Sequence, residues 1–359
     1  MRAAVLPGLN ETLQIRDDVE VNGPGPGEVR VRIAASGVCH SDLSLQNGTL
    51  PHPFPVIPGH EGAGEVLSVG DGVTSVKEGD HVIMAFCAPC GDCPSCLRGQ
   101  PNLCNVIMTD SLTNPRFVVD GMPHWGYAGN GSFSEEIVVR AEAAIPIPED
   151  VPLDVASLIG CGVMTGVGAS LNTAKVTPGS SVAVFGCGGV GLSVIQGARI
   201  CGAAEIIAVD LLESKRENAK KFGATYAVSP NDLAGLSMQL TGGEGFDYAF
   251  EVVGLSSTIR AAWDATRRGG TTCIVGAGKI DDMVMFSAFE IFYMERNLIG
   301  SWYGSADVRR DFPRLLRLWR EGRLDLEGLI SQRIDLSEIN EAFEALKNGE
   351  VIRSVVQFK

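Results

Sequence analysis

The sequence is poor in positive charge and lacks an apolar N-terminal segment. It contains 29 Lys and Arg against 43 Asp and Glu, a net charge of -14, which disfavours nucleic acid or an anionic membrane surface as a partner. The N-terminal stretch MRAAVLPGLNETLQIRDD has no secretory signal core. With ten cysteines and no export signal, we expect a reducing, cytoplasmic location, where thiols bind metal or stay free.

Long hydrophobic runs are nearly absent as well. The segment at residues 176–198 carries no charge and is long enough to span a bilayer as a helix. However, this segment contains Pro178 and several glycines, which divide it into a strand, a turn and a helix. We interpret it as a buried strand–turn–helix unit and expect no membrane partner.

The chain length and the change of pattern along it predict two domains. The early part alternates apolar and polar residues over short stretches, which predicts strands at residues 28–35, 64–69, 81–86 and 134–139. Four prolines at residues 51–58 exclude a helix or a central strand there. From about Val163, predicted strands (181–185, 205–210, 248–253, 271–275, 297–301) alternate with predicted helices (190–201, 213–222, 258–267). This alternation indicates an α/β fold with a doubly wound parallel sheet, and the tail adds a helix at 308–321 and a strand at 354–358.

A G-x-G-x-x-G loop lies between the first strand and first helix of the α/β part, at Gly186, Gly188, Gly189, Val190 and Gly191. Gly186 permits a tight turn, Gly188 lets the backbone approach a pyrophosphate, and Gly191 lets helix and strand pack closely. The helix N-terminus would then face the phosphates with its N–H groups. A glycine-rich turn without a ligand is the alternative.

Asp210 ends the next predicted strand, 19 residues after Gly191. A carboxylate at that point can accept hydrogen bonds from the ribose hydroxyls of NAD, and it would repel the additional phosphate of NADP. Lys215, one turn into the following helix, is a candidate contact for the same ribose. The sequence therefore predicts NAD as the cofactor.

A four-cysteine cluster, C-x2-C-x2-C-x7-C, comprises Cys90, Cys93, Cys96 and Cys104 in a turn-rich stretch. This spacing is typical of a structural zinc that folds its own lobe. An iron–sulfur motif would place the last cysteine after three residues, and disulfides are the alternative in an exported chain. Four further cysteines are interpreted as small buried apolar residues: Cys87, Cys187, Cys201 and Cys273.

A second, looser set of candidate ligands is Cys39, His60 and Cys161, with Glu61 beside the histidine. Three protein ligands and one open position are typical of a catalytic zinc. The spacing alone is weak evidence, because these residues are scattered over more than a hundred positions.

The surrounding residues strengthen this interpretation. Four short segments resemble those of the zinc-dependent medium-chain dehydrogenases. They are Gly37-Val38-Cys39-His40-Ser41-Asp42, Gly59-His60-Glu61 with Gly64 and Gly70, Gly160-Cys161-Gly162, and the pattern Gly349 to Arg353, which we assign to the last helix. The resemblance covers essentially the full chain and points to the class III-like or aryl and primary alcohol dehydrogenase branch. Two cysteines and one histidine are the known catalytic zinc ligands of alcohol dehydrogenases, so this match belongs to the resemblance.

The resemblance implies a GroES-like catalytic domain at residues 1–162 with a zinc lobe at about 87–107, a Rossmann NAD-binding domain at 163–302, and a return to the catalytic domain at 303–359. It implies two zinc ions per chain, at Cys39, His60 and Cys161 and at the four-cysteine cluster. Asp42 would orient His60, Glu61 would displace a metal ligand transiently, and Ser41 would bond the substrate oxygen and begin a proton relay. The further cofactor contacts that it implies are His40, Arg353, Thr165, Val190, Ala277 and Tyr303.

The implied reaction is NAD-linked oxidation of an alcohol to an aldehyde, and its reverse. Zinc would acidify the alcohol as a Lewis acid, and hydride would pass from the resulting alkoxide to nicotinamide. Many relatives have a relay histidine four or five residues after the cysteine, where this chain has Leu43 and Ser44. Water or another residue would have to complete the relay. A competing interpretation of Ser41 is that it caps a helix begun by Asp42.

Three apolar residues match substrate-pocket positions of the family: Leu50, Phe86 and Trp302. They favour a primary alcohol with an aromatic or medium aliphatic group, although plain core packing is the alternative for each. Two other functions stay open: a formaldehyde dehydrogenase acting on a thiol adduct, and a non-catalytic NAD-binding protein.

The apolar stretch 284–293 (VMFSAFEIFY) predicts an exposed sheet edge, and hence a homodimer or a dimer of dimers.

Overall fold

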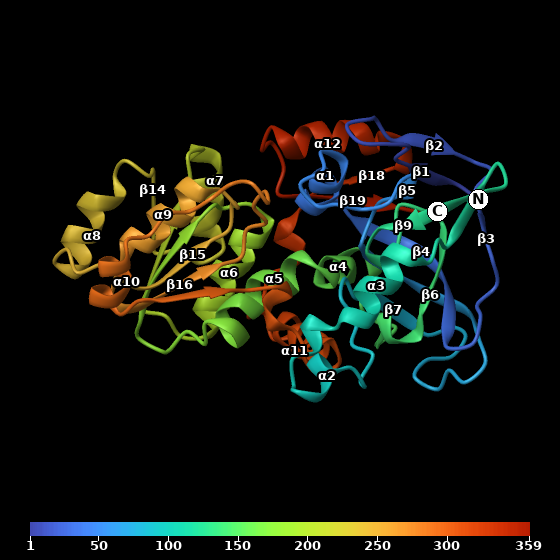
Figure 1. The fold of residues 1–359 in the computed structure, drawn as a ribbon, viewed down its shortest axis with the longest axis horizontal. Coiled ribbons are helices and arrows are strands. Elements are labelled where there is room, and N and C mark those ends of the chain that lie inside the picture. The colour runs from blue at the N-terminus through green and yellow to red at the C-terminus, as the bar shows by residue number, and fades with distance from the viewer. The chain divides into compact units, whose positions relative to one another are not determined.

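The computed structural model describes residues 1–359, which divide into two compact units (Figure 1). The first unit comprises Met1–Gly162, Asp307–Gly322 and Leu326–Lys359. The second comprises Val163–Ala306 and Arg323–Asp325. No single helix is long and apolar enough to cross a membrane, although the bent pair Leu153–Gly160 and Gly162–Thr173 passes that test by length and composition.

The first unit is built mainly from antiparallel strands. One sheet has the order β11-β7-β6-β4-β19-β18, with β10 also pairing with β4; a second has the order β3-β8-β9-β5, and β1 pairs with β2. The strands are β1 (Ala3–Val5), β2 (Gln14–Arg16), β3 (Glu20–Val21), β4 (Glu28–Gly37), β5 (Val56–Ile57), β6 (Glu61–Val69), β7 (His81–Met84), β8 (Phe117–Val119), β9 (Met122–Gly126), β10 (Glu136–Arg140), β11 (Ala144–Ile147), β18 (Ile330–Ile334) and β19 (Arg353–Gln357).

The helices of this unit are short apart from α11. They are α1 (His40–Gln46), α2 (Pro94–Leu97), α3 (Asn105–Thr113), α4 (Leu153–Ser157), α11 (Val308–Arg320) and α12 (Ile339–Lys347). Helix α12 packs its buried face into a core shared with β5 and α1. Gly349 to Ile352, expected to belong to the last helix, instead follow α12 and lead into β19, which begins at Arg353. The positive φ of 73° at Gly349 explains why the helix stops there.

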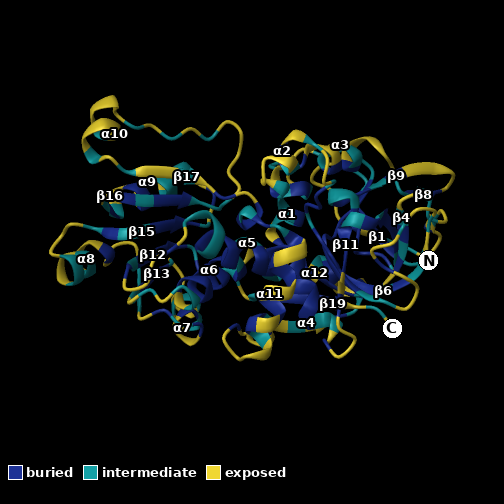
Figure 2. Cartoon of the chain, turned by 90° about the horizontal axis from the view of Figure 1, so that it is seen from below, coloured by how far each residue is buried: buried dark blue, intermediate teal, exposed yellow.

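The second unit contains one parallel sheet of order β14-β13-β12-β15-β16-β17, which confirms the predicted α/β architecture (Figure 1). Its strands are β12 (Ser181–Phe185), β13 (Glu205–Val209), β14 (Tyr226–Val228), β15 (Phe246–Glu251), β16 (Thr266–Ile274) and β17 (Asn297–Gly300). Its helices are α5 (from Gly162 to Gly168), α6 (Gly189–Ile200), α7 (Glu213–Lys221), α8 (Leu233–Thr241), α9 (Ser256–Ala265) and α10 (Ala288–Met294). Strands β12 and β13 are almost entirely buried (Figure 2), as expected for continuous apolar strands covered by helices.

Chain order along this sheet reverses beside β12, which has β13 on one side and β15 on the other. In open parallel sheets, ligands bind outside the carboxyl ends of the strands at such a point. The loop after β12 contains the G-x-G-x-x-G motif. The topology therefore places the predicted nucleotide loop where a dinucleotide would bind.

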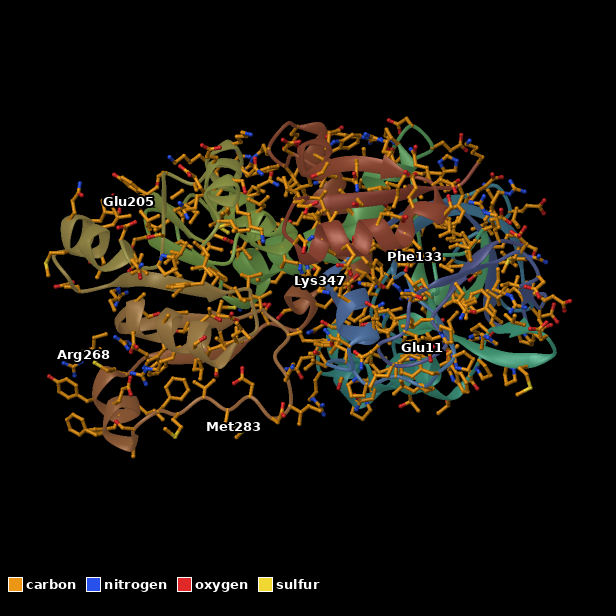
Figure 3. The ribbon with its side chains drawn as sticks, turned by 90° about the horizontal axis from the view of Figure 1, so that it is seen from above. Glu11, Phe133, Glu205, Arg268, Met283 and Lys347 are labelled. Carbon is orange, nitrogen blue, oxygen red and sulfur yellow. The ribbon has the colours of Figure 1, made fainter.

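The prediction of an exposed strand at residues 284–293 is wrong. Ser287 and Glu290 form a capping box that starts helix α10, with the Ser287 hydroxyl accepting from the Glu290 N–H at 2.9 Å. An extended segment bearing Met283 leads into this helix (Figure 3). The actual edge strand is β17, whose residues are largely exposed.

Candidate active site

Cys39, His60 and Cys161 come together in the first unit, although they are far apart in the chain. Cys39 follows β4 and is the N-cap of α1, His60 directly precedes β6, and Cys161 immediately precedes α5. All three are buried, and their ligand atoms lie within 4.8 Å of one another and of a Glu61 carboxylate oxygen. The spacing of these atoms suits a single metal ion.

The Asp42 carboxylate holds the His60 ring in one orientation. Asp42 Oδ1 accepts hydrogen bonds from His60 Nδ1 at 3.1 Å and from the Gly59 N–H at 2.9 Å, and Oδ2 accepts from the Cys39 N–H at 3.1 Å. Since a carboxylate only accepts, Nδ1 carries a proton, which leaves Nε2 as the ring nitrogen that can bind a metal once it is deprotonated. His60 Nε2 is buried and has no hydrogen-bond partner, so it is free to ligate zinc.

The two thiols differ in acidity. A hydrogen bond from the Cys161 thiol lowers the pKa of Cys39 well below its ordinary value, against the opposing effect of burial. The same bond, together with burial, raises the pKa of Cys161. One thiolate is thus favoured before a metal binds, and a cation would favour the second.

Glu61 and Arg353 form a buried charged pair beside the triad. Glu61 Oε1 accepts the Gly162 N–H at 2.8 Å and lies 3.8 Å from Arg353 Nη2, whereas Glu61 Oε2 has no partner. Burial raises the pKa of Glu61 to about 7, although the Arg353 guanidinium opposes that shift. Gly37 leaves room for this carboxylate, because a Cβ there would lie 2.3 Å from Oε2.

Helix α1 positions the remaining predicted residues of the first unit. Ser41 Oγ lies 3.8 Å from Cys39 Sγ, and His40 is exposed. The helix begins at His40 with Cys39 as its N-cap, so Ser41 lies in the first turn and is not the cap. This removes the competing interpretation of Ser41. Leu43, one of the two residues where many relatives have the relay histidine, packs against the core of this unit.

Aromatic rings flank the histidine ligand. Phe86 meets the His60 ring edge-on at 5.3 Å between centroids, and Tyr127 does so at 5.2 Å. Tyr127 in turn meets His52 edge-on at 5.5 Å. Leu50 is partly buried two residues before His52. The sequence pointed to Phe86 and Leu50 but not to Tyr127, in a short 3-10 helix, or to His52, in a loop, because neither belongs to a distinguishing motif.

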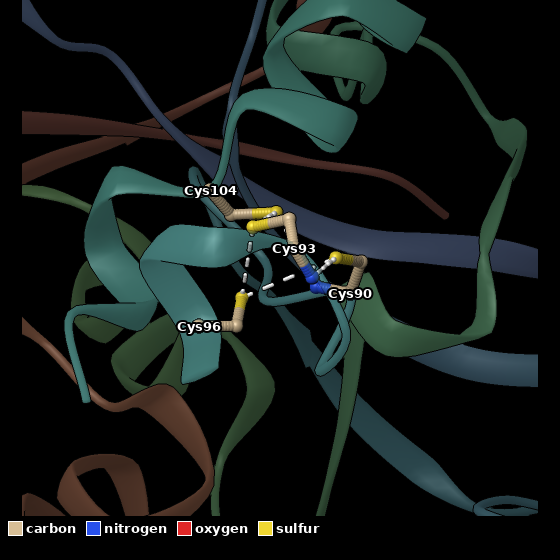
Figure 4. A group of neighbouring side chains, drawn as sticks. All are labelled: Cys90, Cys93, Cys96 and Cys104. Atoms are coloured by element: carbon tan, nitrogen blue, oxygen red, sulfur yellow. Dashed lines mark hydrogen bonds between the residues drawn. The ribbon is translucent and has the colours of Figure 1, made fainter. Parts of the chain in front are cut away.

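The four-cysteine cluster has the geometry of a zinc site (Figure 4). Sγ–Sγ distances are 3.5 Å for Cys93–Cys96, 4.0 Å for Cys90–Cys96 and 3.9 Å for Cys93–Cys104. A tetrahedral zinc with Zn–S bonds of about 2.3 Å would separate its sulfurs by about 3.8 Å. A hydrogen bond from the Cys96 backbone N–H is the main reason that the pKa of Cys93 falls to about 6. All ten cysteines are free thiols.

In the second unit, the glycine loop meets the requirements of a dinucleotide. Gly186 has φ of +95°, and a Cβ at Gly191 would lie 1.9 Å from the Gly186 carbonyl oxygen. By contrast, a Cβ at Gly188, the N-cap of α6, would meet nothing within 4 Å. The loop therefore leaves space for a phosphate at the N-terminus of α6, where Gly189 and Val190 form the first turn.

The Asp210 side chain is fixed to this loop. Its Oδ2 accepts the Cys187 N–H at 2.8 Å and its Oδ1 accepts the Leu212 N–H at 2.9 Å. Lys215 in α7 is partly buried, and Arg216 donates to the Asp210 and Leu211 carbonyls at 2.9 and 2.8 Å. Each carboxylate oxygen retains one further lone pair for a ribose hydroxyl.

The other predicted cofactor contacts are spread over the second unit. Thr165 in α5 is partly buried and Ala277 is exposed. Trp302, predicted to line the substrate pocket, is 40% exposed. Tyr303 is buried and has φ of +53°. Three exposed apolar side chains after β13 and β15, which no motif in the sequence marks, are of the kind that would hold a flat adenine ring: Leu211, Val253 and Leu255.

Comparisons with known proteins agree with this geometry. Residues 25–149 match the model of the alcohol dehydrogenase GroES-like domain, and residues 189–321 match that of zinc-binding dehydrogenases. The chain is 40% identical to an alcohol dehydrogenase class-3 of Cereibacter sphaeroides (99% of each chain covered) and 39% identical to an S-(hydroxymethyl)glutathione dehydrogenase of Photobacterium damsela (99% of each).

Among solved structures, benzyl alcohol dehydrogenase from Acinetobacter calcoaceticus superposes with a TM-score of 0.93 at 30% identity, over 100% of this chain and 99% of that one. Both sequence relatives extend over nearly all of this chain, and the chain contains two groups of residues whose ligand atoms could each hold a metal ion. The chain belongs to the zinc-dependent medium-chain alcohol dehydrogenases, enzymes that use zinc and a nicotinamide dinucleotide on small alcohols and aldehydes.

Proposed function

We propose that this enzyme oxidises a primary alcohol with an aromatic or medium-chain aliphatic group to the aldehyde, and catalyses the reverse reduction. The observation that carries the proposal is the aromatic pair, Phe86 and Tyr127, on the ring of the ligand histidine His60. Apolar and aromatic walls favour substrates with an apolar body and one polar end. The substrate hydroxyl is that polar end.

Zinc at Cys39, His60 and Cys161 would act as a Lewis acid that makes the alcohol hydroxyl acidic. Asp42 keeps His60 in the tautomer that ligates metal. Ser41, within contact of Cys39 Sγ, would accept the substrate proton and pass it on. Glu61, whose Oε2 is unpartnered and buried, supplies a second carboxylate beside the metal position.

NAD is the proposed cofactor in preference to NADP. Both oxygens of Asp210 are anchored by backbone N–H groups, so the carboxylate cannot easily turn away from a phosphate on the ribose. A fixed negative charge would repel that phosphate and accept bonds from the free hydroxyls of NAD.

A formaldehyde dehydrogenase that acts on a thiol adduct is the second candidate. It is favoured by the 39% identity to the S-(hydroxymethyl)glutathione dehydrogenase. An anionic adduct would need accessible basic side chains, whereas Arg353 near the metal site is buried and paired with Glu61. The absence of an accessible basic side chain in this pair favours an uncharged alcohol, rather than an anionic thiol adduct, as the substrate.

We further propose that the enzyme is a cytoplasmic homodimer, with a homotetramer as the alternative. Edge strand β17 is uncovered, and helix α10 exposes three aromatic side chains: Phe289, Phe292 and Tyr293. An open sheet edge beside exposed apolar residues favours pairing with a second copy. The free state of all ten thiols supports a reducing compartment.

A substrate panel with the zinc-loaded enzyme tests the proposal. Benzyl alcohol and medium-chain primary alcohols should give NAD-dependent turnover, whereas formaldehyde activity only in the presence of added glutathione would favour the second candidate. Ser41→Ala should lower kcat by about 10²- to 10⁴-fold while zinc and NAD binding stay intact. Part of that loss should return at high pH, where the alcohol ionises without help. Parent-like turnover of Ser41→Ala across the pH range would contradict the proposed role.

A further inference from the structure

His52 lies in the loop between α1 and β5 and has one unused ring nitrogen. Its Nδ1 is 3.0 Å from the Pro53 carbonyl oxygen. Its Nε2 is buried and has no hydrogen-bond partner. The ring is held edge-on to Tyr127, at 76° between the ring planes.

The neighbours of His52 decide which nitrogen carries the proton. A carbonyl oxygen only accepts, so the bond to Pro53 requires the proton on Nδ1. Burial lowers the pKa of His52, which keeps the imidazole neutral near pH 7. Nε2 is therefore a hydrogen-bond acceptor with nothing to accept, and buried polar atoms in native proteins normally have a partner.

Two ring contacts connect this acceptor to the metal ligand. Tyr127 meets both rings edge-on, His60 at 5.2 Å and His52 at 5.5 Å between centroids. An aromatic alcohol with its hydroxyl at the metal would extend its ring along such an aromatic wall. A substituent at the far side of that ring would reach the region of His52, and a donor there would satisfy Nε2.

We propose that His52 is a specificity-determining residue that accepts a hydrogen bond from a phenolic hydroxyl on the ring of an aromatic alcohol. The preferred substrate class is then the hydroxybenzyl-type alcohols. This inference rests on the proposed function, and it adds a polar contact at the far end of the substrate to the apolar residues predicted to line the pocket.

The test compares alcohols that differ only in the ability to donate this bond. Hydroxybenzyl and methoxybenzyl alcohols, substituted at ring position 3 or 4, are measured with the zinc-loaded enzyme and NAD, with benzyl alcohol as the reference. At the matching position, kcat/KM for the hydroxy compound should exceed that for the methoxy compound by about 5- to 100-fold. A methoxy oxygen accepts but cannot donate.

Two variants assign that preference to His52. His52→Phe retains a ring against Tyr127 but removes both nitrogens, so the hydroxy-to-methoxy ratio should fall to near one. His52→Asn retains an acceptor and should keep part of the ratio. The matched control is His124→Phe, because His124 is also buried and its Nδ1 is 3.1 Å from a backbone carbonyl oxygen, that of Met122; this variant should keep the parent ratio.

A parent ratio near one, or a ratio that His52→Phe leaves unchanged, would overturn the inference and would mean that water satisfies Nε2. A ratio that His124→Phe lowers equally would also overturn it. The ratio cancels general losses of stability, since both substrates meet the same protein. If the zinc-loaded parent turns over none of these alcohols, benzyl alcohol included, then the proposed function fails instead.

Discussion

Asp42→Asn is the most informative change at the candidate active site, because one carboxylate serves three donors there. Asp42 is fully buried and accepts from His60 Nδ1, the Gly59 N–H and the Cys39 N–H. In the best arrangement, the asparagine oxygen replaces Oδ1 and keeps two of these bonds. Its NH2 group would then face the Cys39 N–H, so that two donors oppose each other.

The magnitude follows from these bonds. One hydrogen bond to a charged acceptor is lost, at about 1.5–3 kcal/mol, and the other two lose the contribution of the negative charge. The weakened hydrogen bonds are those that fix the positions of Cys39 and His60. Because both residues are candidate metal ligands, we expect the substitution to weaken metal binding. Losing such a partner of a metal-bound histidine typically lowers metal affinity by about 10- to 100-fold.

Chelator competition with measurement of zinc per chain provides the assay. Asp42→Asn should release one zinc at about 10- to 100-fold lower chelator concentration than the parent, and the second zinc should stay at the four-cysteine cluster. Asp80→Asn is the matched control, since the Asp80 carboxylate likewise accepts a backbone N–H, that of Lys77 at 2.9 Å, and Asp80 belongs to neither set of candidate metal ligands. If Asp42→Asn keeps both zinc ions at the parent midpoint, the orientation of His60 by Asp42 does not matter for metal binding and the reasoning is refuted.

Three further outcomes are expected. Asp210→Ser should lower the NAD-to-NADP ratio of kcat/KM by about 5- to 100-fold, because ribose bonds are lost and repulsion is relieved; an unchanged ratio would rule out Asp210 as the selecting residue. Cys104→Ala should lower the melting temperature and remove one zinc, and parent-like melting with two zinc ions would contradict a structural site. Sedimentation at micromolar concentration should show a dimer or tetramer, and a monomer would disprove the proposed association through β17 and α10.

Local patterns allowed the architecture and two of the sites to be predicted. The four cysteines lie within 15 consecutive positions, so the turns between them are sufficient to bring their sulfurs together. The glycine loop likewise depends on one strand, one turn and one helix, and the structure has all three at the expected residues. Continuous apolar strands that alternate with helices predicted the parallel sheet for the same reason, because periodicity is a local property.

Long-range contacts were accessible only through family resemblance or not at all. Cys39, His60 and Cys161 meet because β4 pairs with β6, and because the segment before α5 lies beside them. The pairing of Glu61 with Arg353, and the contact of Tyr127 with both His60 and His52, likewise depend on how distant segments pack.

At residues 284–293, the secondary structure predicted from the local pattern was wrong. Their apolar character suggested a strand, while a local capping box at Ser287 and Glu290 produced a helix. The sequence by itself determined the elements and the local metal and nucleotide motifs, since these depend on neighbours along the chain. Only the tertiary structure decided which buried side chains share the metal site, because the register between distant strands is not a local property.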